Sequence, residues 1–173
     1  MKGACRMNLR SAFRALAVPA LLGLAAGTPN PGQAAAATVE AAEFVVAITD
    51  DDGNARSIEA DIVPYLPGRA CFGWQLRFAD APGVIQYREI LKLPEAPAFW
   101  SGEGDSYSTH SYSADRTTAT TEAFAAPDAE GWIYSSWCIA PGDPVGAHSI
   151  EVYIDDELVR RFDFEVKRPR GGD

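Results

Sequence analysis

Histidine and cysteine, on which many catalytic and metal-binding sites depend, are scarce in this sequence of 173 residues. The two histidines, His110 and His148, stand 38 residues apart, and no H-x-x-x-H or C-x-x-C spacing occurs. A zinc site needs several such ligands at short spacings, and a Ser/His/Asp triad needs a histidine between a nucleophile and a carboxylate. The Gly-x-Ser-x-Gly motif of a serine nucleophile is also absent. We therefore expect no metal, no cofactor and no histidine-based catalysis.

Basic residues are also few, and four of the fifteen lie within the first 14 residues. They precede an apolar stretch, 15–26, which is followed by the small residues Ala34–Ala37. This order is typical of a secretory signal peptide. The alternative is a retained membrane anchor, but a spanning helix needs about 20 apolar residues and this stretch is shorter. We predict that residues 1–37 are a cleaved signal peptide and that the mature protein is periplasmic or secreted, without membrane insertion.

The predicted mature chain is strongly acidic. After Ala37 there are 11 basic and 24 acidic residues, a net charge of −13. Nucleic acids and anionic lipids are bound mainly through Lys and Arg, so this composition argues against both as partners.

Of the three cysteines, Cys5 falls within the predicted signal peptide, which leaves Cys71 and Cys138. An even pair in an oxidising compartment predicts a disulfide. Closing a loop of this length stabilises a protein by roughly 4 kcal/mol in the chain-entropy model. The alternative, a reactive thiol, would need a neighbouring group that lowers the thiol pKa.

After residue 37 no stretch shows the 3.6-residue period of an amphipathic helix, whereas the two-residue period of a β-strand recurs. The clearest example is 70–78, in which every second residue is a large apolar one: Phe72, Trp74, Leu76 and Phe78. The polar segment 106–113 is either an edge strand or part of a loop. The candidate strands are 43–49, 57–63, 70–78, 84–93, 106–113, 117–125, 132–140, 147–154 and 158–166.

The last two candidate strands predict a β-hairpin, because they alternate on either side of the turn sequence 155–157. In the second of them, the alternation places Leu158 on the same face as Phe162. The acidic run 50–54 predicts another turn, because it contains Asp-Gly. A calcium site on these carboxylates is the alternative, although the run lacks the Gly and Glu that an EF-hand loop needs.

Seven to nine short strands, regularly spaced turns and no helix predict an all-β fold, an antiparallel β-sandwich of immunoglobulin-like (Ig-like) type with one disulfide. A closed barrel is the alternative architecture. The predicted domain spans 38–166, and residues 167–173 are expected to form a disordered tail.

Two motifs support this fold by resemblance. The segment 142–146, followed by 149–154 and 162–166, resembles the last hairpin of many bacterial exported Ig-like modules. The pairing of Cys71-Phe-Gly-Trp74 with Trp137-Cys138 resembles small periplasmic proteins known only as domains of unknown function. The resemblance implies the fold and brings no catalytic residues with it.

Glycoside hydrolysis would need two carboxylates in one cleft. Glu89 and Glu122 are the acidic candidates within strand patterns. Glu89 shares a predicted face with apolar residues, and a salt bridge to Arg77 or an edge position explains it equally well.

Aromatic residues are concentrated in and around the long irregular stretch 94–116. Long loops in compact domains are often functional, and exposed Trp and Tyr side chains suit a protein, peptide or carbohydrate ligand. We therefore predict that Trp100, Tyr107 and Tyr112 contact a partner. The alternative is that Trp100 is a plug that fills the core beneath the loop.

Together these features predict a non-enzymatic interaction module that binds a protein or peptide of the cell envelope. A carbohydrate-binding module and a small cell-envelope hydrolase are the alternatives.

Overall fold

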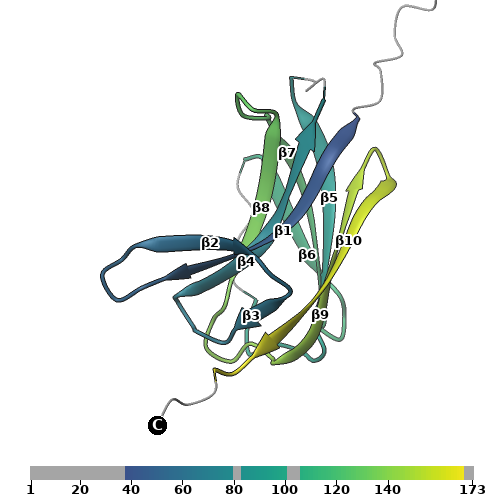
Figure 1. Ribbon diagram of the computed structural model, residues 1–173. Helices are drawn as coiled ribbons and strands as arrows, with labels where there is room; N and C mark the ends of the chain where they lie inside the picture. Colours follow the sequence, from purple (N-terminus) through teal and green to yellow (C-terminus); the bar gives the residue numbers. More distant parts are fainter. Residues whose placement is uncertain (1–37, 80–82, 101–105, 170–173) are drawn as a thin grey trace, which may run out of the picture. The chain divides into compact units, whose positions relative to one another are not determined.

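The computed structural model describes residues 38–79, 83–100 and 106–169, and every regular element in these ranges is a β-strand (Figure 1). The predicted signal peptide lies outside the described residues. The ten strands are β1 (Val39–Thr49), β2 (Ala55–Glu59), β3 (Ile62–Pro64), β4 (Ala70–Phe78), β5 (Ile85–Lys92), β6 (Ser108–Tyr112), β7 (Thr118–Ala125), β8 (Trp132–Cys138), β9 (Gly146–Ile154) and β10 (Glu157–Lys167).

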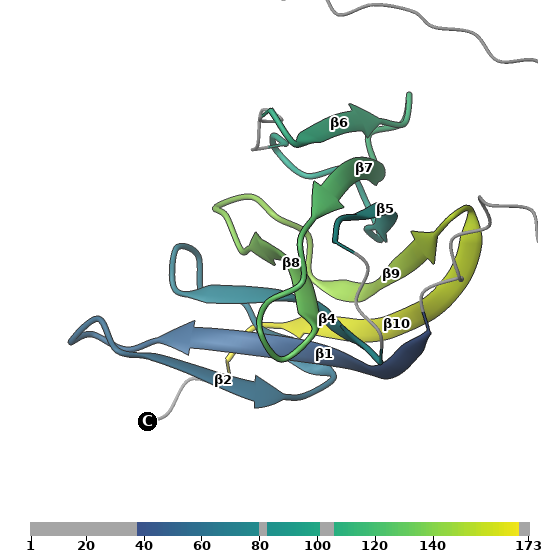
Figure 2. The same cartoon turned by 90° about the horizontal axis from the view of Figure 1, so that it is seen from above.

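The strands form two sheets that pack face to face (Figure 2). The smaller sheet has the order β2-β1-β4-β8, and the larger has the order β3-β10-β9-β5-β7-β6. All pairings are antiparallel except that of β3 with β10. This arrangement confirms the predicted Ig-like sandwich and excludes the closed barrel.

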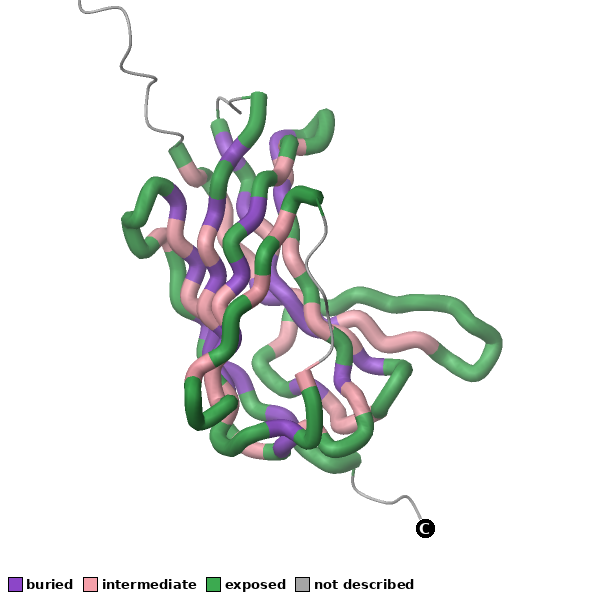
Figure 3. The backbone as a smooth tube through the Cα atoms, turned by 180° about the vertical axis from the view of Figure 1, so that it is seen from behind, coloured by how far each residue is buried: buried purple, intermediate pink, exposed green. Residues whose placement is uncertain are grey.

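The sequence pattern 57–63, expected to be one strand, is two strands in different sheets. β2 pairs with β1, whereas β3 crosses to the larger sheet and pairs with β10. The burial changes at the same point, because every residue of β2 is exposed and Val63 of β3 is fully buried. The hairpin of β1 and β2 accordingly projects from the body of the sandwich (Figure 3). This split gives ten strands rather than the predicted seven to nine.

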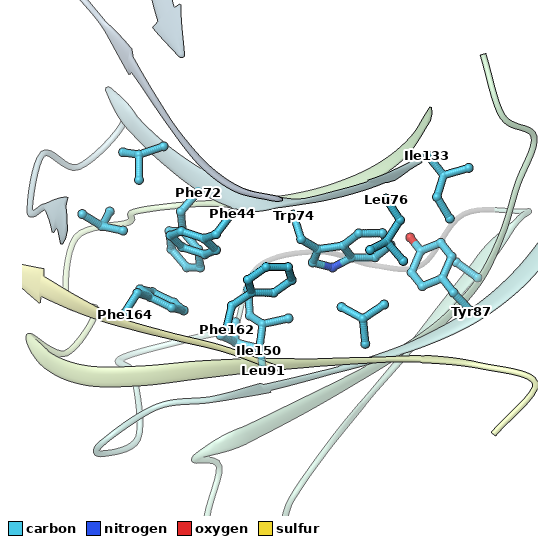
Figure 4. Close-up of a cluster of buried hydrophobic side chains, with 14 of the residues drawn as sticks. Phe44, Phe72, Trp74, Leu76, Tyr87, Leu91, Ile133, Ile150, Phe162 and Phe164 are labelled. Atoms are coloured by element: carbon cyan, nitrogen blue, oxygen red, sulfur yellow. The ribbon is translucent and has the colours of Figure 1, made fainter. Parts of the chain in front are cut away.

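The core lies between the inner faces of the two sheets (Figure 4). The alternation predicted for 70–78 is confirmed, since all four of its large apolar residues are buried. Phe164 of β10 stacks on Phe44 of β1 at 4.6 Å, and Trp74 meets the edge of Tyr87 at 5.1 Å. Each large side chain buried in this way contributes about 1.5–3 kcal/mol, which binds the sheets together.

The predicted disulfide between Cys71 and Cys138 is present. Its position differs from that in immunoglobulin domains, where the bond crosses the core between the sheets. Here the cysteines are directly opposite each other on β4 and β8, neighbouring strands of one sheet. Since their side chains alternate with the buried Phe72 and the half-buried Trp137, they lie on the outer face of that sheet. The bond therefore fastens an edge strand to its neighbour.

The C-terminal hairpin is confirmed as β9 and β10, joined at Asp155 and Asp156, which both have positive φ. The expected position of Leu158 on the inner face is wrong. The pairing register shifts between Leu158 and Arg160, and this bulge leaves Leu158 exposed and turns Val159 toward the core. An extra residue at a bulge reverses the alternation on one side of it.

Candidate functional site

The structure brings two of the three predicted contact residues together. Trp100 stacks on Tyr112 of β6 at 5.1 Å, with 20° between the ring planes, and meets Trp137 edge-on at 5.9 Å. Its indole nitrogen donates a hydrogen bond to the backbone oxygen of Arg116 at 3.0 Å. Trp100 is half-buried against the core, so its indole closes part of the side of the sandwich.

Tyr107 lies apart from this cluster. Tyr107 directly precedes β6, whereas Tyr112 is the last residue of that strand. Tyr107 is 70% exposed. Tyr107 instead borders a groove on the same side of the molecule.

The groove exists because one sheet is wider than the other. Trp137 of β8 forms a hydrogen bond with Glu89 of β5 across the core, so the edge strand β8 faces β5. Two further strands, β7 and β6, follow β5 in the larger sheet and extend past β8 (Figure 2). No strand of the smaller sheet lies beyond β8 to cover the inner face of these two strands, although Trp137 of β8 reaches His110 of β6 at one end.

A hollow of about 540 Å³ lies at this overhang. Its buried lining is small or apolar and includes Tyr87, Ala123 and Ile133. Three exposed aromatic residues surround it: Tyr107, Phe124 and Tyr134, with exposed fractions of 70%, 54% and 72%. Exposed aromatic side chains around a concavity are typical of binding surfaces. We call this hollow the β8 groove.

One end of the β8 groove is acidic. Asp128 lines it, and its Oδ1 accepts the backbone N–H groups of Glu130 and Trp132 at 3.0 and 2.8 Å. Glu130 is exposed beside it. The basic residue at this end, Arg77, lies over the ring of Trp132 and pairs with Glu40 at 3.3 Å.

Glu89, one of the two carboxylates considered for hydrolysis, is inside the sandwich and only 1% exposed. Both of its oxygens accept indole N–H groups, from Trp74 and from Trp137. The two alternative explanations for Glu89, a salt bridge to Arg77 and an edge position, are both wrong, because Arg77 pairs with Glu40 and β5 is a central strand. Glu122 lies beside Arg88 on the outer face of the same sheet, so the two carboxylates do not share a cleft.

The two histidines are also separate. His110 of β6 has Nδ1 3.0 Å from Oγ1 of Thr121 and meets the edge of Trp137. His148 is buried, stacks on Phe164, and donates from Nδ1 to the Gly146 carbonyl at 2.8 Å. Burial lowers the pKa of His148 and so favours its neutral form. The described ranges contain no group of three or more metal-ligating side chains.

Residues 50–54, the alternative calcium site, form a turn in which the carboxylate of Asp50 bonds to the backbone of the turn itself. Oδ1 of Asp50 accepts the backbone N–H groups of Asp52 and Asn54 at 3.1 and 2.8 Å. The bond from Asn54 is the main reason that the pKa of Asp50 is lowered. This geometry is that of a hairpin turn closed by an Asp side chain.

A sequence model of the PM0630 beta sandwich domain matches residues 42–167. The chain belongs to this family. Its fold is similar to that of an immunoglobulin-like protein from Pseudomonas aeruginosa, PA1606, with a TM-score of 0.54 and 12% identity over 79% of this chain and all of that one. At this identity the likeness concerns the fold alone. A comparison with curated protein sequences finds no match.

Membership of this β-sandwich family agrees with the observed all-β fold. A disulfide in an Ig-like domain is typical of the periplasm or the extracellular space. Within the described residues no helix is long and apolar enough to cross a membrane.

The sequence analysis missed the β8 groove. Phe124 and Tyr134 occupy solvent-facing positions of strands that were recognised, and exposed aromatic residues in such positions were the available signal. Their convergence with Tyr107 depends on the order of the strands, which the local pattern does not contain.

Proposed function

We propose that this Ig-like domain is a non-catalytic interaction module of the cell envelope that binds a segment of a protein partner in the β8 groove. The observation that carries the proposal is the ring of three exposed aromatic residues, Tyr107, Phe124 and Tyr134, around a concave surface. Aromatic anchors bury large areas at low side-chain entropy cost, which is why they dominate protein interfaces.

Among the residues predicted from sequence, the proposal keeps Tyr107 as a direct contact. Trp100 and Tyr112 support the same side of the sandwich through their stacked rings, next to Trp137. Their role in this proposal is to hold β6 in place beside the groove.

Site-specific photo-crosslinking in the producing cell tests the proposal. A photo-reactive phenylalanine replaces Tyr134 in the full chain, and in a matched control it replaces Ile58, an exposed apolar residue on β2 at the opposite edge of the same sheet. We expect discrete protein adducts from position 134 and none from position 58. The adducts should weaken when Phe124→Ala is added.

Equal adducts from both positions would contradict a site at the groove. Capture of glycans instead of protein at position 134 would favour the carbohydrate-binding alternative, since exposed tyrosines also stack on sugar rings.

A further inference from the structure

The free edge of β8 has a regular set of backbone groups that point away from its neighbour β4. At the two ends of this pairing, the N–H of Ile139 bonds to the carbonyl of Ala70 and the N–H of Phe78 bonds to that of Gly131. Antiparallel bonding alternates from residue to residue, so Ile133, Ser135 and Trp137 also bond to β4. The backbone groups of the residues between and after them, Tyr134, Ser136 and Cys138, therefore face the other side.

This outer side of β8 carries no described strand. At the start of β8, Trp132 already bonds to Asp128 through both its N–H and its C=O, which closes the edge at that end. The open stretch thus begins at Tyr134, which lines the β8 groove, and ends at Cys138, beyond the groove.

Edge strands usually carry features that prevent pairing with other chains, such as charged residues, proline or short length. The other described edges are β2, β3 and β6, and β6 has only five residues. β2 contains Arg56 and Glu59, and β3 is three residues long and ends in Pro64. By contrast, the sequence of β8, WIYSSWC, has seven residues with no charge and no proline. β8 is thus the long uncharged edge strand of the smaller sheet.

The distance by which the larger sheet extends past β8 limits how many strands can pair with this edge. The larger sheet continues beyond β8 by two strands, β7 and β6. A single added strand, about 4.8 Å from β8, would lie beneath them and complete the sandwich on this side. If a second copy of the domain paired through its own β8, the β6 and β7 strands of the two copies would collide. The overhang therefore favours a single added segment over a dimer.

The residues around the free edge of β8 indicate the composition of the segment that would bind there. Side chains directed inward would meet small or apolar groups, including Ala123 and Ala125. Outward side chains would lie on a strongly acidic molecule, with Asp128 and Glu130 at one end of the groove. Apolar residues alternating with Lys, Arg or Thr match both requirements.

We infer that the β8 groove takes its partner as one extended, alternating apolar and basic segment that adds as a fifth strand to the free edge of β8. This mode of recognition draws affinity from main-chain hydrogen bonds and specificity from alternate side chains. The inference rests on the proposed function, because it concerns the same groove, but it adds a backbone requirement that side-chain binding does not have.

Amide hydrogen exchange on the full secreted chain tests this requirement. The probe is a capped nine-residue peptide that alternates valine with lysine or threonine. We expect rapid exchange at Tyr134, Ser136 and Cys138 in the free protein and at least tenfold slower exchange with saturating peptide. The amides of Ser135 and Trp137, which already bond to β4, should be slow in both states.

A proline variant gives a second measurement. Ser136→Pro removes one of the outward N–H groups at an edge position, where proline is tolerated, and should weaken peptide binding at least tenfold. Ser57→Pro is the matched control, because Ser57 occupies the equivalent outward position on the opposite edge strand β2, as the bond from Asp50 N–H to the Asn54 carbonyl shows. It should bind the peptide within about threefold of the parent protein.

If Ser136→Pro does not fold, methylation of the peptide nitrogens at odd or at even positions replaces it, and only one of the two sets should abolish binding. Strand addition would be overturned by equal losses from both sets or by a lack of peptide binding. It would also be overturned if the amides of Tyr134, Ser136 and Cys138 exchanged slowly in the free protein. A dimer that Ser136→Pro makes monomeric would overturn it as well. Protein adducts from position 134 without alternating protection would overturn this inference and leave the proposed function standing.

Discussion

The indole nitrogen of Trp137 lies 2.5 Å from Oε1 of Glu89, which joins an edge strand of one sheet to a central strand of the other. Oε2 of the same carboxylate accepts the indole N–H of Trp74. No ion pair of the described residues includes Glu89, so two neutral donors hold this buried carboxylate. A buried polar group is costly unless its hydrogen bonds are made, and here both oxygens have a partner.

Replacing the Glu89 carboxylate should therefore destabilise the domain. In Glu89→Gln one indole N–H faces an amide NH₂ instead of an oxygen, and we expect a loss of about 1–3 kcal/mol in the free energy of unfolding. Urea denaturation followed by tryptophan fluorescence measures it. Glu122→Gln, at an exposed position on the neighbouring strand β7, is the control and should change the value by less than about 0.5 kcal/mol. Equal midpoints for the two variants would contradict this role of Glu89.

Gly73 is required by the close approach of β4 and β8. A Cβ atom at this position would lie 2.0 Å from the backbone oxygen of Ser135 and 2.8 Å from Cα of Ser136. We expect Gly73→Ala to cost at least about 2 kcal/mol, because backbone must move to relieve the overlap. Gly83→Ala, where no atom lies within 4 Å of the added carbon, is the control. Thermal unfolding of both compares them, and an unchanged midpoint for Gly73→Ala would refute the requirement.

The disulfide should stabilise the domain by holding β8 against β4. It links residues 67 positions apart, so the double variant Cys71→Ser, Cys138→Ser is expected to lose about 2–4 kcal/mol of unfolding free energy. Urea denaturation with and without reductant measures this. Reductant should lower the midpoint of the parent protein and leave that of the double variant unchanged. A parent protein that is insensitive to complete reduction, verified by thiol alkylation, would disagree with this expectation.

His148 should make stability depend on pH. Burial lowers its folded pKa below the ordinary value of 6.5, so the unfolded chain binds a proton more readily than the native protein. Stability from this residue is complete above about pH 6.5 and falls as the pH drops below it. Asp143, whose pKa is raised from 3.8 by burial, has the opposite effect: it adds stability as the pH falls through its raised folded pKa.

Unfolding free energies at about pH 7.5 and 5.5 test this expectation. His148→Asn keeps a donor for the Gly146 carbonyl and does not titrate in this range. Its stability should therefore change less between the two pH values than that of the parent protein. An identical pH dependence would show that another group is responsible.

Trp100 and Tyr107, both predicted as partner contacts, should respond differently to truncation. Trp100 contacts two aromatic rings and a backbone carbonyl, so Trp100→Ala is expected to cost about 3–5 kcal/mol of stability. Tyr107 is mostly exposed, and Tyr107→Ala should change stability by less than about 0.5 kcal/mol. Thermal midpoints measure the first effect. Crosslinking yield from position 134 measures the loss of partner contact expected for Tyr107→Ala.

The sequence alone was enough to predict most of the strands and, for several of them, the face that is buried. A side chain in a strand alternates between two faces, so the pattern of 70–78 identified Trp74 and Leu76 as core residues without knowledge of the neighbours. The same local reasoning identified the C-terminal hairpin. The disulfide followed from composition, since two cysteines remained after the predicted signal peptide.

Pairing between distant segments came only from the tertiary structure. It placed β2 and β3 in different sheets, put the disulfide within one sheet, and gave Glu89 its two indole donors. It also separated Tyr107 from Trp100 and Tyr112, and brought Tyr107 to the groove with Phe124 and Tyr134. Alternation records which face of a strand is buried, but strand order and sheet width arise from contacts between residues far apart in the chain. The groove forms because the two sheets differ in width and the larger one extends beyond the edge of the smaller one.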